Sequence, residues 1–312
     1  MANILLLDDL NPIGAEILEK AGHTVTSSGP LNGDNLIKAL SDKQAVAVRS
    51  ASKLTREIIE KCPDLKLIGR AGVGTDNIDK VASAERQVKV INAPLANTNS
   101  AAEHALALMM SLARKIPLAD RLMRQNEWPK KLCTGIEFPG KTLGVVGAGN
   151  VGRRVIQVSQ ALGMKVIVSD VMLSAEKAKE LNVTLVDIDT LVKTADILTF
   201  HVPLTPETNH MINAERLAQM KPTALVINCS RGGVIDETAL YEALKSKTIG
   251  GAAVDVFENE PLKDSPLTEL DNVILTPHLG AATGEAQITA AKDIADQFEE
   301  YFENGNLRHP VN

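Results

Sequence analysis

The chain has 312 residues, of which 44% are hydrophobic and only 3% aromatic, and its formal net charge is −6 at pH 7. This length exceeds that of one average domain and predicts two, each able to bury a core of aliphatic side chains. The negative charge, without a block of lysine and arginine, argues against a nucleic-acid surface, and no run of 18 apolar residues predicts a membrane span.

Short aliphatic strands alternate with helical segments along the first part of the chain, and a second series with the same alternation begins near residue 141. This pattern is typical of parallel βαβ units, so the predicted fold class is α/β. In the first series, strands are expected at 2–9, 23–28, 45–50, 65–72 and 88–94, with helices at 11–22, 33–41, 55–62 and 78–86. The opening strand has no basic residues before it, so we expect no signal peptide.

A long helical pattern over 99–128 joins the two series, and Pro117 predicts a kink in it. The second series differs from the first in strand number and shares no repeat with it, which favours two different domains. We expect the C-terminal helix, over 284–301, to return to the first domain. The strands of the second series are expected at 141–149, 165–170, 183–187, 196–203, 224–230, 250–257 and 272–278.

The second series opens with a glycine-rich turn between a predicted strand and a predicted helix. In "GVVGAGNVG", Gly147, Gly149 and Gly152 have the G-x-G-x-x-G spacing, which permits close approach of the backbone to a pyrophosphate at a helix N-terminus. Asp170 ends the following strand, where a carboxylate can bind the adenosine ribose and repel a 2′-phosphate. The pattern therefore predicts a dinucleotide site that prefers NAD to NADP.

Three later strand ends carry ionisable residues. "NCSRGG" places Arg231 after a strand, "AAVDVFENEP" supplies Asp255 and Glu260, and "VILTPHLG" supplies His278. Each alone has an ordinary explanation: a local ion pair, a solvated carboxylate or a satisfied core histidine. Ligands of open α/β sheets bind beyond the carboxyl ends of strands, so their occurrence together makes Arg231, Glu260 and His278 candidate catalytic residues.

With these segments, "RAGVGTDNID", "HVPLTPET" and "TPHLGAAT", the chain resembles the D-isomer-specific 2-hydroxyacid dehydrogenases over essentially its whole length. The resemblance implies a flavodoxin-like substrate-binding domain at 1–94 and 284–312, a Rossmann NAD-binding domain at 95–283, and a homodimer. It also implies that Arg231, Glu260 and His278 are catalytic. The residues that it implies for contacts with NAD are Asn150, Val151, Asp170, Val202, Cys229, Ser230, Asp255 and Gly280.

This resemblance gives each candidate catalytic residue a chemical role. The planar guanidinium of Arg231 can hold the carboxylate of a 2-oxo acid and polarise its keto oxygen. His278 exchanges the proton of the substrate hydroxyl. Glu260 raises the pKa of His278 by accepting a hydrogen bond from the imidazole nitrogen that faces away from the substrate. Asp255 would lie near the nicotinamide carboxamide. The formate dehydrogenase branch pairs its histidine with glutamine, so Glu260 argues against formate.

The first series carries the candidate substrate-binding residues. Backbone N–H groups of Val73 and Gly74 can approach a carboxylate. Arg49 and Ser50 follow a first-domain strand, where a second cation can bind a distal phosphate, although an arginine there can also cap a nearby helix. This "RS" segment, with Asn97, resembles the 3-phosphoglycerate dehydrogenase branch. We therefore expect oxidation of 3-phospho-D-glycerate to 3-phosphohydroxypyruvate, and, from the end at "HPVN", no C-terminal regulatory domain.

Three other functions remain open from the sequence. A glyoxylate or hydroxypyruvate reductase uses the same scaffold, and only Arg49 distinguishes it. An NAD(H)-sensing co-repressor can keep the same residues, and a two-domain binder with an inactive site is also possible. The three cysteines, Cys62, Cys133 and Cys229, are odd in number and lack metal-site spacing, so we expect a reducing cytoplasm and no bound metal.

Overall fold

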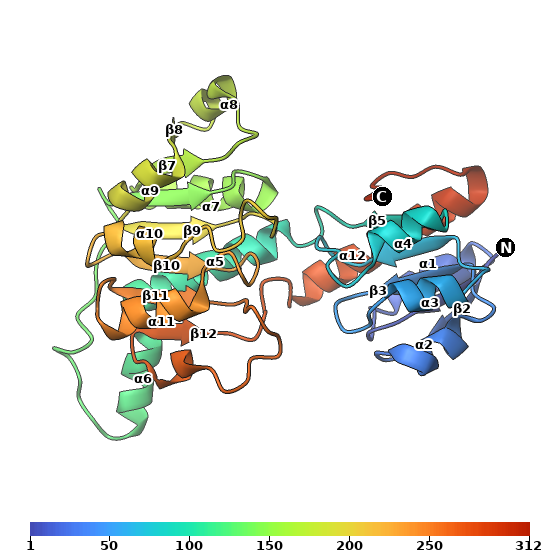
Figure 1. Ribbon diagram of the computed structural model, residues 1–312, viewed down its shortest axis with the longest axis horizontal. Helices are drawn as coiled ribbons and strands as arrows, with labels where there is room; N and C mark the ends of the chain where they lie inside the picture. The colour runs from blue at the N-terminus through green and yellow to red at the C-terminus, as the bar shows by residue number, and fades with distance from the viewer. The chain divides into compact units, whose positions relative to one another are not determined.

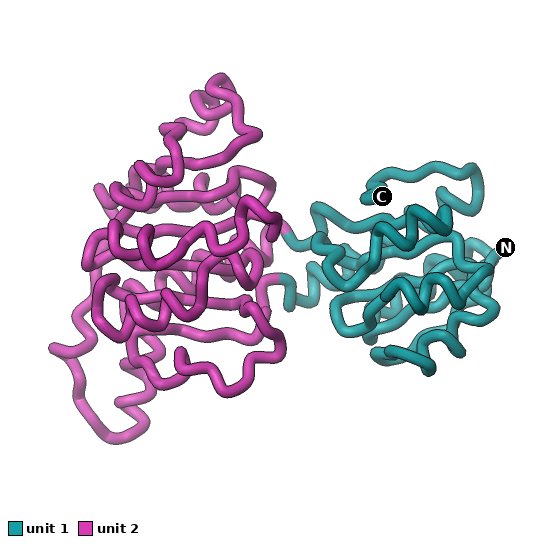
Figure 2. Tube along the Cα trace, viewed as in Figure 1, with its two compact units in different colours: residues 1–97, 281–312 teal, residues 98–280 magenta.

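The computed structural model describes residues 1–312 and divides into two compact units (Figure 2). Unit 1 comprises Met1–Asn97 and Ala281–Asn312, and unit 2 comprises Thr98–Gly280. Each contains one sheet of parallel strands with helices, so the predicted α/β class is confirmed. None of the helices combines the length and the hydropathy that crossing a membrane requires.

Unit 1 contains a five-stranded sheet in the order β2-β1-β3-β4-β5, which is the flavodoxin-like order. Figure 1 shows its strands β2, β3 and β5 with the helices beside them. Its helices are α1 (Ile13–Lys20), α2 (Gly33–Leu40), α3 (Arg56–Lys61), α4 (Lys80–Glu85) and α12 (Gly284–Asn304). Its strands are β1 (Asn3–Leu6), β2 (Thr24–Ser27), β3 (Ala45–Val48), β4 (Leu67–Arg70) and β5 (Lys89–Asn92).

The central strands of unit 1 are buried on both faces, as expected for a parallel sheet between helices. All four residues of β3 are buried, and their aliphatic side chains alternate between two core clusters. The C-terminal helix α12 packs against α1 and β4, and it contributes the fully buried Ile294 and Phe298 to one of these clusters. The last helix of the chain therefore completes the core that the first strand begins.

Unit 2 contains a seven-stranded sheet in the order β12-β11-β10-β9-β6-β7-β8, whose strand order reverses between β6 and β9. Ligands of such sheets bind beyond the carboxyl ends of the strands, near this reversal. The strands are β6 (Thr142–Val146), β7 (Lys165–Ser169), β8 (Thr184–Leu185), β9 (Ile197–Phe200), β10 (Leu225–Asn228), β11 (Gly251–Val254) and β12 (Val273–Leu275). The helices are α5 (Thr98–Ala113), α6 (Ile116–Arg124), α7 (Asn150–Ala161), α8 (Ala175–Glu180), α9 (Ile188–Thr194), α10 (Ala214–Gln219) and α11 (Glu237–Lys245), with a short 3-10 helix at Pro266–Glu269.

The expected kinked helix over 99–128 is instead two helices. α5 ends at Ala113, and Lys115 adopts a left-handed conformation, with φ of 53°, before α6 begins. Pro117 lies in the first turn of α6, where the N–H group that proline lacks has no helical partner. Pro117 therefore helps to start α6, and the helical conformation is interrupted before it, at Lys115.

Candidate active site

The glycine-rich turn joins β6 to α7 at the point where the strand order reverses. A Cβ atom on Gly152 would lie only 2.1 Å from the carbonyl oxygen of Gly147, so this packing of helix against turn requires glycine. α7 begins at Asn150, and its N-cap residue, Gly149, supplies no side chain to its first N–H groups. These groups and the positive end of the helix dipole suit a phosphate.

Asp170 follows β7 and lines an open surface groove of about 560 Å³. Its carboxylate accepts hydrogen bonds from the backbone N–H of Ala148, at 2.6 Å, and of Met172, at 2.7 Å. A third comes from Leu173 N–H, at 3.1 Å. Since two carboxylate oxygens can accept about four hydrogen bonds, one position is left for a ribose hydroxyl. The groove and this free acceptor position are therefore suited to the ribose of a dinucleotide.

The other residues expected to contact NAD follow the carboxyl ends of the strands in the same sheet. This edge also carries the three candidate catalytic residues. Val202 follows β9, Cys229 and Ser230 follow β10, Asp255 directly follows β11, and Gly280 lies in the loop after β12.

The loop after β10 is held rigidly around Arg231. The Asn228 side chain donates a hydrogen bond to the Arg231 carbonyl oxygen at 3.0 Å and accepts one from the Ser230 hydroxyl at 2.9 Å. The next residue, Gly232, lies so close to the Phe257 carbonyl oxygen that a Cβ atom would meet it at 1.9 Å. The segment that carries Arg231 therefore packs directly against the segment that leads to Glu260.

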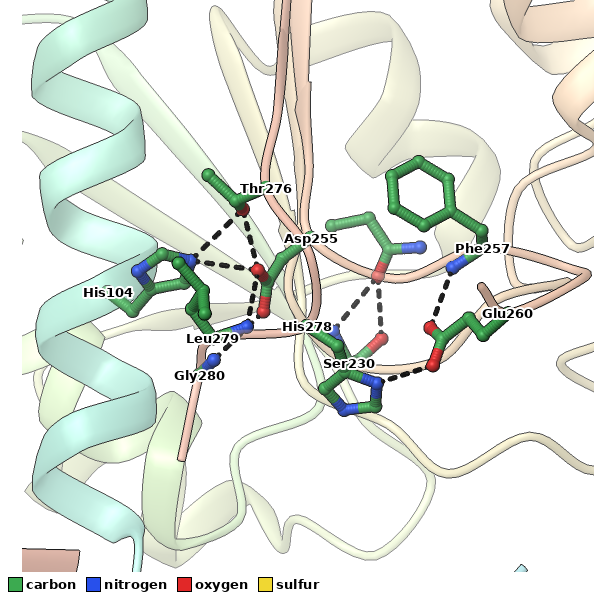
Figure 3. Close-up of polar contacts among 10 residues, drawn as sticks. His104, Ser230, Asp255, Phe257, Glu260, Thr276, His278, Leu279 and Gly280 are labelled. Carbon is green, nitrogen blue, oxygen red and sulfur yellow. Dashed lines mark hydrogen bonds and ion pairs between the residues drawn. The ribbon is translucent and has the colours of Figure 1, made fainter. Parts of the chain in front are cut away.

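Glu260 and His278 form a hydrogen-bonded pair (Figure 3). Nδ1 of His278 lies 2.7 Å from Oε2 of Glu260, and the other carboxylate oxygen accepts a hydrogen bond from Phe257 N–H at 3.0 Å. Since the carboxylate can only accept, Nδ1 carries a proton and Nε2 is left to exchange one. About half of the His278 side chain, 47%, is exposed, so it is open to a substrate.

The pair shifts the pKa of both partners. The hydrogen bond to Glu260 raises the pKa of His278 above its usual value, against the effects of burial and of the Arg231 charge. Burial alone would raise the pKa of Glu260, but hydrogen bonds from His278 and Phe257 N–H outweigh burial and lower it. The arrangement is suited to a proton donor and acceptor near neutral pH.

The structure adds two residues to this region that the sequence analysis missed. His104, on α5, and Thr276, after β12, both contact the carboxylate of Asp255, which is completely buried. Neither role has a sequence signal: His104 occupies one position of a helical pattern, and Thr276, although it lies in "TPHLGAAT", has no feature there that points to Asp255. Only the folded sheet brings them together.

His104, Cys229 and Asp255 place potential metal ligands within 4.8 Å of one another. However, the Asp255 carboxylate already accepts four hydrogen bonds. Burial, aided by the Asp255 charge, raises the pKa of the Cys229 thiol, whereas metal binding requires a thiolate. His104 and Asp255 are therefore better described as a hydrogen-bonded pair, with Cys229 nearby, than as part of a metal centre.

In unit 1, the residues expected to contact substrate also follow strand ends. Arg49 and Ser50 follow β3, Val73 and Gly74 follow β4, and Asn97 lies beyond β5. A buried carboxylate that the sequence analysis missed, Asp8, orders the first of these loops. It accepts hydrogen bonds from Arg49 N–H, at 2.8 Å, and from the Ser52 hydroxyl, at 2.5 Å. The Arg49 backbone is thereby fixed, while no protein group pairs with its guanidinium.

Comparisons with known proteins agree with this geometry. Residues 106–280 match the model of the D-isomer specific 2-hydroxyacid dehydrogenase family, NAD binding domain. Over its full length the chain is 48% identical to a D-3-phosphoglycerate dehydrogenase of Synechocystis sp., of which it covers 56%. The chain spans only 56% to 60% of the length of the curated relatives that it matches first.

Of the solved structures that are similar to this chain, two illustrate the match over nearly its whole length. One is a D-lactate dehydrogenase from Aquifex aeolicus complexed with NAD and lactic acid, at 30% identity and a TM-score of 0.86, with 97% of this chain and 96% of that chain covered. The other is a glyoxylate reductase from Paecilomyes thermophila, at 28% identity and a TM-score of 0.90, with 99% and 98% covered.

Proposed function

Since this chain belongs to the D-isomer-specific 2-hydroxyacid dehydrogenase family, we propose that it transfers a hydride between NAD and a D-2-hydroxy acid, with 3-phospho-D-glycerate as its substrate. Unit 2 is the NAD-binding domain, and unit 1 binds the substrate. The observation that carries the proposal is the pair of His278 and Glu260, which lies at the same sheet edge as the dinucleotide turn.

The glycine-rich turn before α7 and Asp170 would hold NAD, which would supply the hydride acceptor for C2 of the hydroxy acid. Nε2 of His278 removes the hydroxyl proton in oxidation and returns it in reduction. Glu260 holds the imidazole in the correct tautomer and stabilises its charged form. Arg231 binds the substrate carboxylate and polarises the oxygen on C2, where negative charge develops in reduction.

The phosphorylated substrate is proposed on the strength of Arg49. Its backbone is anchored by Asp8, and its guanidinium is not used to cap a helix or to pair with a carboxylate of the protein. A half-buried cation without a protein partner is suited to an anion of the ligand. The Synechocystis relative, which matches the whole of this chain, is itself named a D-3-phosphoglycerate dehydrogenase.

Replacement of Arg49 by alanine tests this substrate assignment. We expect a higher KM for 3-phosphohydroxypyruvate, at a cost of about 1.5–3 kcal/mol, the range for a hydrogen bond to a charged group. The KM for glyoxylate should hardly change, because glyoxylate has no distal phosphate. Steady-state kinetics of the variant with both substrates measure the difference. Equal weakening of both substrates, or of neither, would contradict the assignment.

A variant of Asp170 tests the cofactor site. Asp170→Ala should weaken NAD binding by about 1–3 kcal/mol, because it removes a charged acceptor for a ribose hydroxyl. The preference for NAD over NADP should narrow as well, since the carboxylate no longer repels a 2′-phosphate. Titration of cofactor fluorescence with NADH and NADPH measures both effects. Because Asp170 also binds backbone N–H groups of the turn, unchanged secondary structure by circular dichroism is the necessary control.

The second candidate function is a glyoxylate or hydroxypyruvate reductase. The similarity to the glyoxylate reductase structure favours it, and Arg231, Glu260 and His278 would serve it equally well. It differs from the first proposal in one respect: its substrates have no distal phosphate for Arg49 to bind. Faster reduction of glyoxylate than of 3-phosphohydroxypyruvate by the unmodified protein would decide for it.

We also propose a homodimer that uses α6 and the loop after it. α6 contains no buried residue, although Ile116 and Met123 are apolar, and the loop exposes Leu132 and 80% of Trp128. Exposed apolar side chains on a helix and on the loop that follows it are candidates for an interaction surface. Light scattering that gives the mass of one chain would contradict the dimer. The cytoplasmic location expected from the three unpaired cysteines stays a prediction.

A further inference from the structure

The carboxylate of Asp255 is the centre of a second histidine–carboxylate contact, separate from the pair of His278 and Glu260 (Figure 3). Its Oδ1 accepts a hydrogen bond from the Thr276 hydroxyl at 2.6 Å and lies 3.0 Å from Nε2 of His104. It also accepts from Leu279 N–H at 2.8 Å, while Oδ2 accepts from Gly280 N–H at 3.0 Å. No part of this side chain is exposed.

The protonation of His104 follows from these contacts. The Thr276 hydroxyl gives its only proton to Asp255, so towards His104, at 3.2 Å, it can only accept. The ionised carboxylate can also only accept. Nε2 of His104 therefore carries a proton and donates it to this pair of oxygens. Burial alone would raise the pKa of Asp255, but the hydrogen bonds, with that of His104 first among them, lower it and keep the carboxylate charged.

Asp255 in turn fixes the segment that carries His278. Its carbonyl oxygen accepts a hydrogen bond from His278 N–H at 2.9 Å, and its carboxylate holds the next two N–H groups. His278 has φ of 55°, a left-handed conformation that few residues other than glycine adopt without cost. Three consecutive N–H groups bound to one residue stabilise this conformation.

We propose that His104 is a positioning residue of the active site: its Nε2–H holds the carboxylate of Asp255, which holds residues 278–280 in the conformation that directs His278 towards Glu260. The proposal rests on the proposed function for its effect on turnover. His104 need not touch substrate or cofactor in this role. It extends the site from the loops of the sheet to helix α5.

Two variants separate the donated proton from the bulk of the side chain. His104→Leu removes the donor, and we expect turnover in 2-oxo acid reduction to fall about 10-fold to 100-fold, with a much smaller change in the KM of the oxo acid. His104→Gln offers an amide N–H and should recover most of the lost turnover. In His104→Leu, the hydrogen bond between His278 and Glu260 should form less often, so the pKa of His278 should fall. The limb of the pH profile that reports this pKa should therefore move to lower pH. Asp255 and Arg231 are the other charged groups that act on His278.

A merely structural role would give a different pattern. His23, which is half-buried and contacts Phe302 in unit 1, provides the control. His23→Leu should lower the melting temperature and leave the pH profile unchanged. The proposal would be wrong if His104→Leu did the same, or if His104→Gln were as impaired as His104→Leu at an unchanged melting temperature.

A measurement without catalysis keeps this inference distinct from the proposed function. The protein has six histidines, and with ¹⁵N-labelled imidazoles their pKa values can be followed by NMR, with His278→Ala identifying the signals of His278. We expect the pKa of His278 to be lower in His104→Leu than in the unmodified protein. An unchanged value would overturn the positioning role, even if the enzyme is active. If no 2-oxo acid is reduced but the pKa falls, the proposed function fails and the positioning role holds.

Discussion

Replacement of His278 by alanine is expected to reduce turnover by about two to four orders of magnitude, the usual contribution of a general acid or base. Nε2 is the only proton-exchanging atom that the pair with Glu260 leaves open towards a substrate. NADH binding should change little, because the imidazole is assigned to the substrate and not to the cofactor. Rapid-mixing kinetics for turnover and fluorescence titration for NADH measure the two quantities.

The pH dependence of Glu260→Gln gives the matching test of the pair. Reduction requires the imidazolium form of His278 and is therefore fast below the pKa of His278, which Glu260 raises. Removal of the carboxylate should lower the pKa of His278. As the pH rises, the rate of reduction should therefore begin to fall at a lower pH than in the unmodified protein, and the rate of oxidation should begin to rise at a lower pH. A wild-type pH profile in Glu260→Gln, with wild-type turnover in His278→Ala, would show that the pair is not the acid–base group.

Arg231→Lys should damage the reaction with every 2-oxo acid, by about 100-fold in kcat/KM, the cost of misplacing a reacting group by an ångström. Lysine keeps the positive charge but lacks the planar pair of N–H donors that can hold a carboxylate and a keto oxygen together. The loop should keep its hydrogen bonds with the Asn228 side chain, although the hydrogen bond from the Arg231 guanidinium to the Ser230 carbonyl oxygen is lost.

The control for Arg231→Lys is Arg49→Lys, which also exchanges guanidinium for ammonium. On glyoxylate, Arg49→Lys should behave like the unmodified protein, whereas Arg231→Lys should be almost inactive. If glyoxylate reduction by Arg231→Lys keeps more than about a tenth of the normal kcat/KM, less than 1.4 kcal/mol of transition-state binding is lost, and Arg231 is not the group that binds the reacting centre.

The sequence was sufficient for the fold class, because short continuous aliphatic runs that alternate with helical segments, and glycine turns, are local signals. It was less accurate at strand ends. The run 224–230 was expected to be strand throughout, but β10 ends at Asn228, after which Ser230 N–H bonds to the Asn228 side chain instead of a neighbouring strand. The hydrophobicity of a residue does not indicate whether its N–H group bonds to a neighbouring strand or to a nearby side chain. The break before α6 was missed for a similar reason, since a left-handed Lys115 has no sequence signal.

The residues that support the candidate site were not predictable from local patterns. His104 and Thr276 are 172 residues apart and meet only because α5 packs beside the sheet that ends in β12. Arg231, Glu260 and His278 could be proposed because each follows a strand, and all parallel strands end at one edge of their sheet. Their roles, and that of Arg49, stay predictions until the variants are measured.

NADH oxidation by the unmodified protein, with a panel of phosphorylated and unphosphorylated 2-oxo acids, tests the central claim most directly. The proposed function predicts NADH-dependent reduction, with a higher kcat/KM for 3-phosphohydroxypyruvate than for glyoxylate, hydroxypyruvate or pyruvate, and little activity with NADPH. Equal kcat/KM values for glyoxylate and 3-phosphohydroxypyruvate would contradict the phosphorylated substrate. If none of these acids supports NADH oxidation, the proposed dehydrogenase activity itself is contradicted.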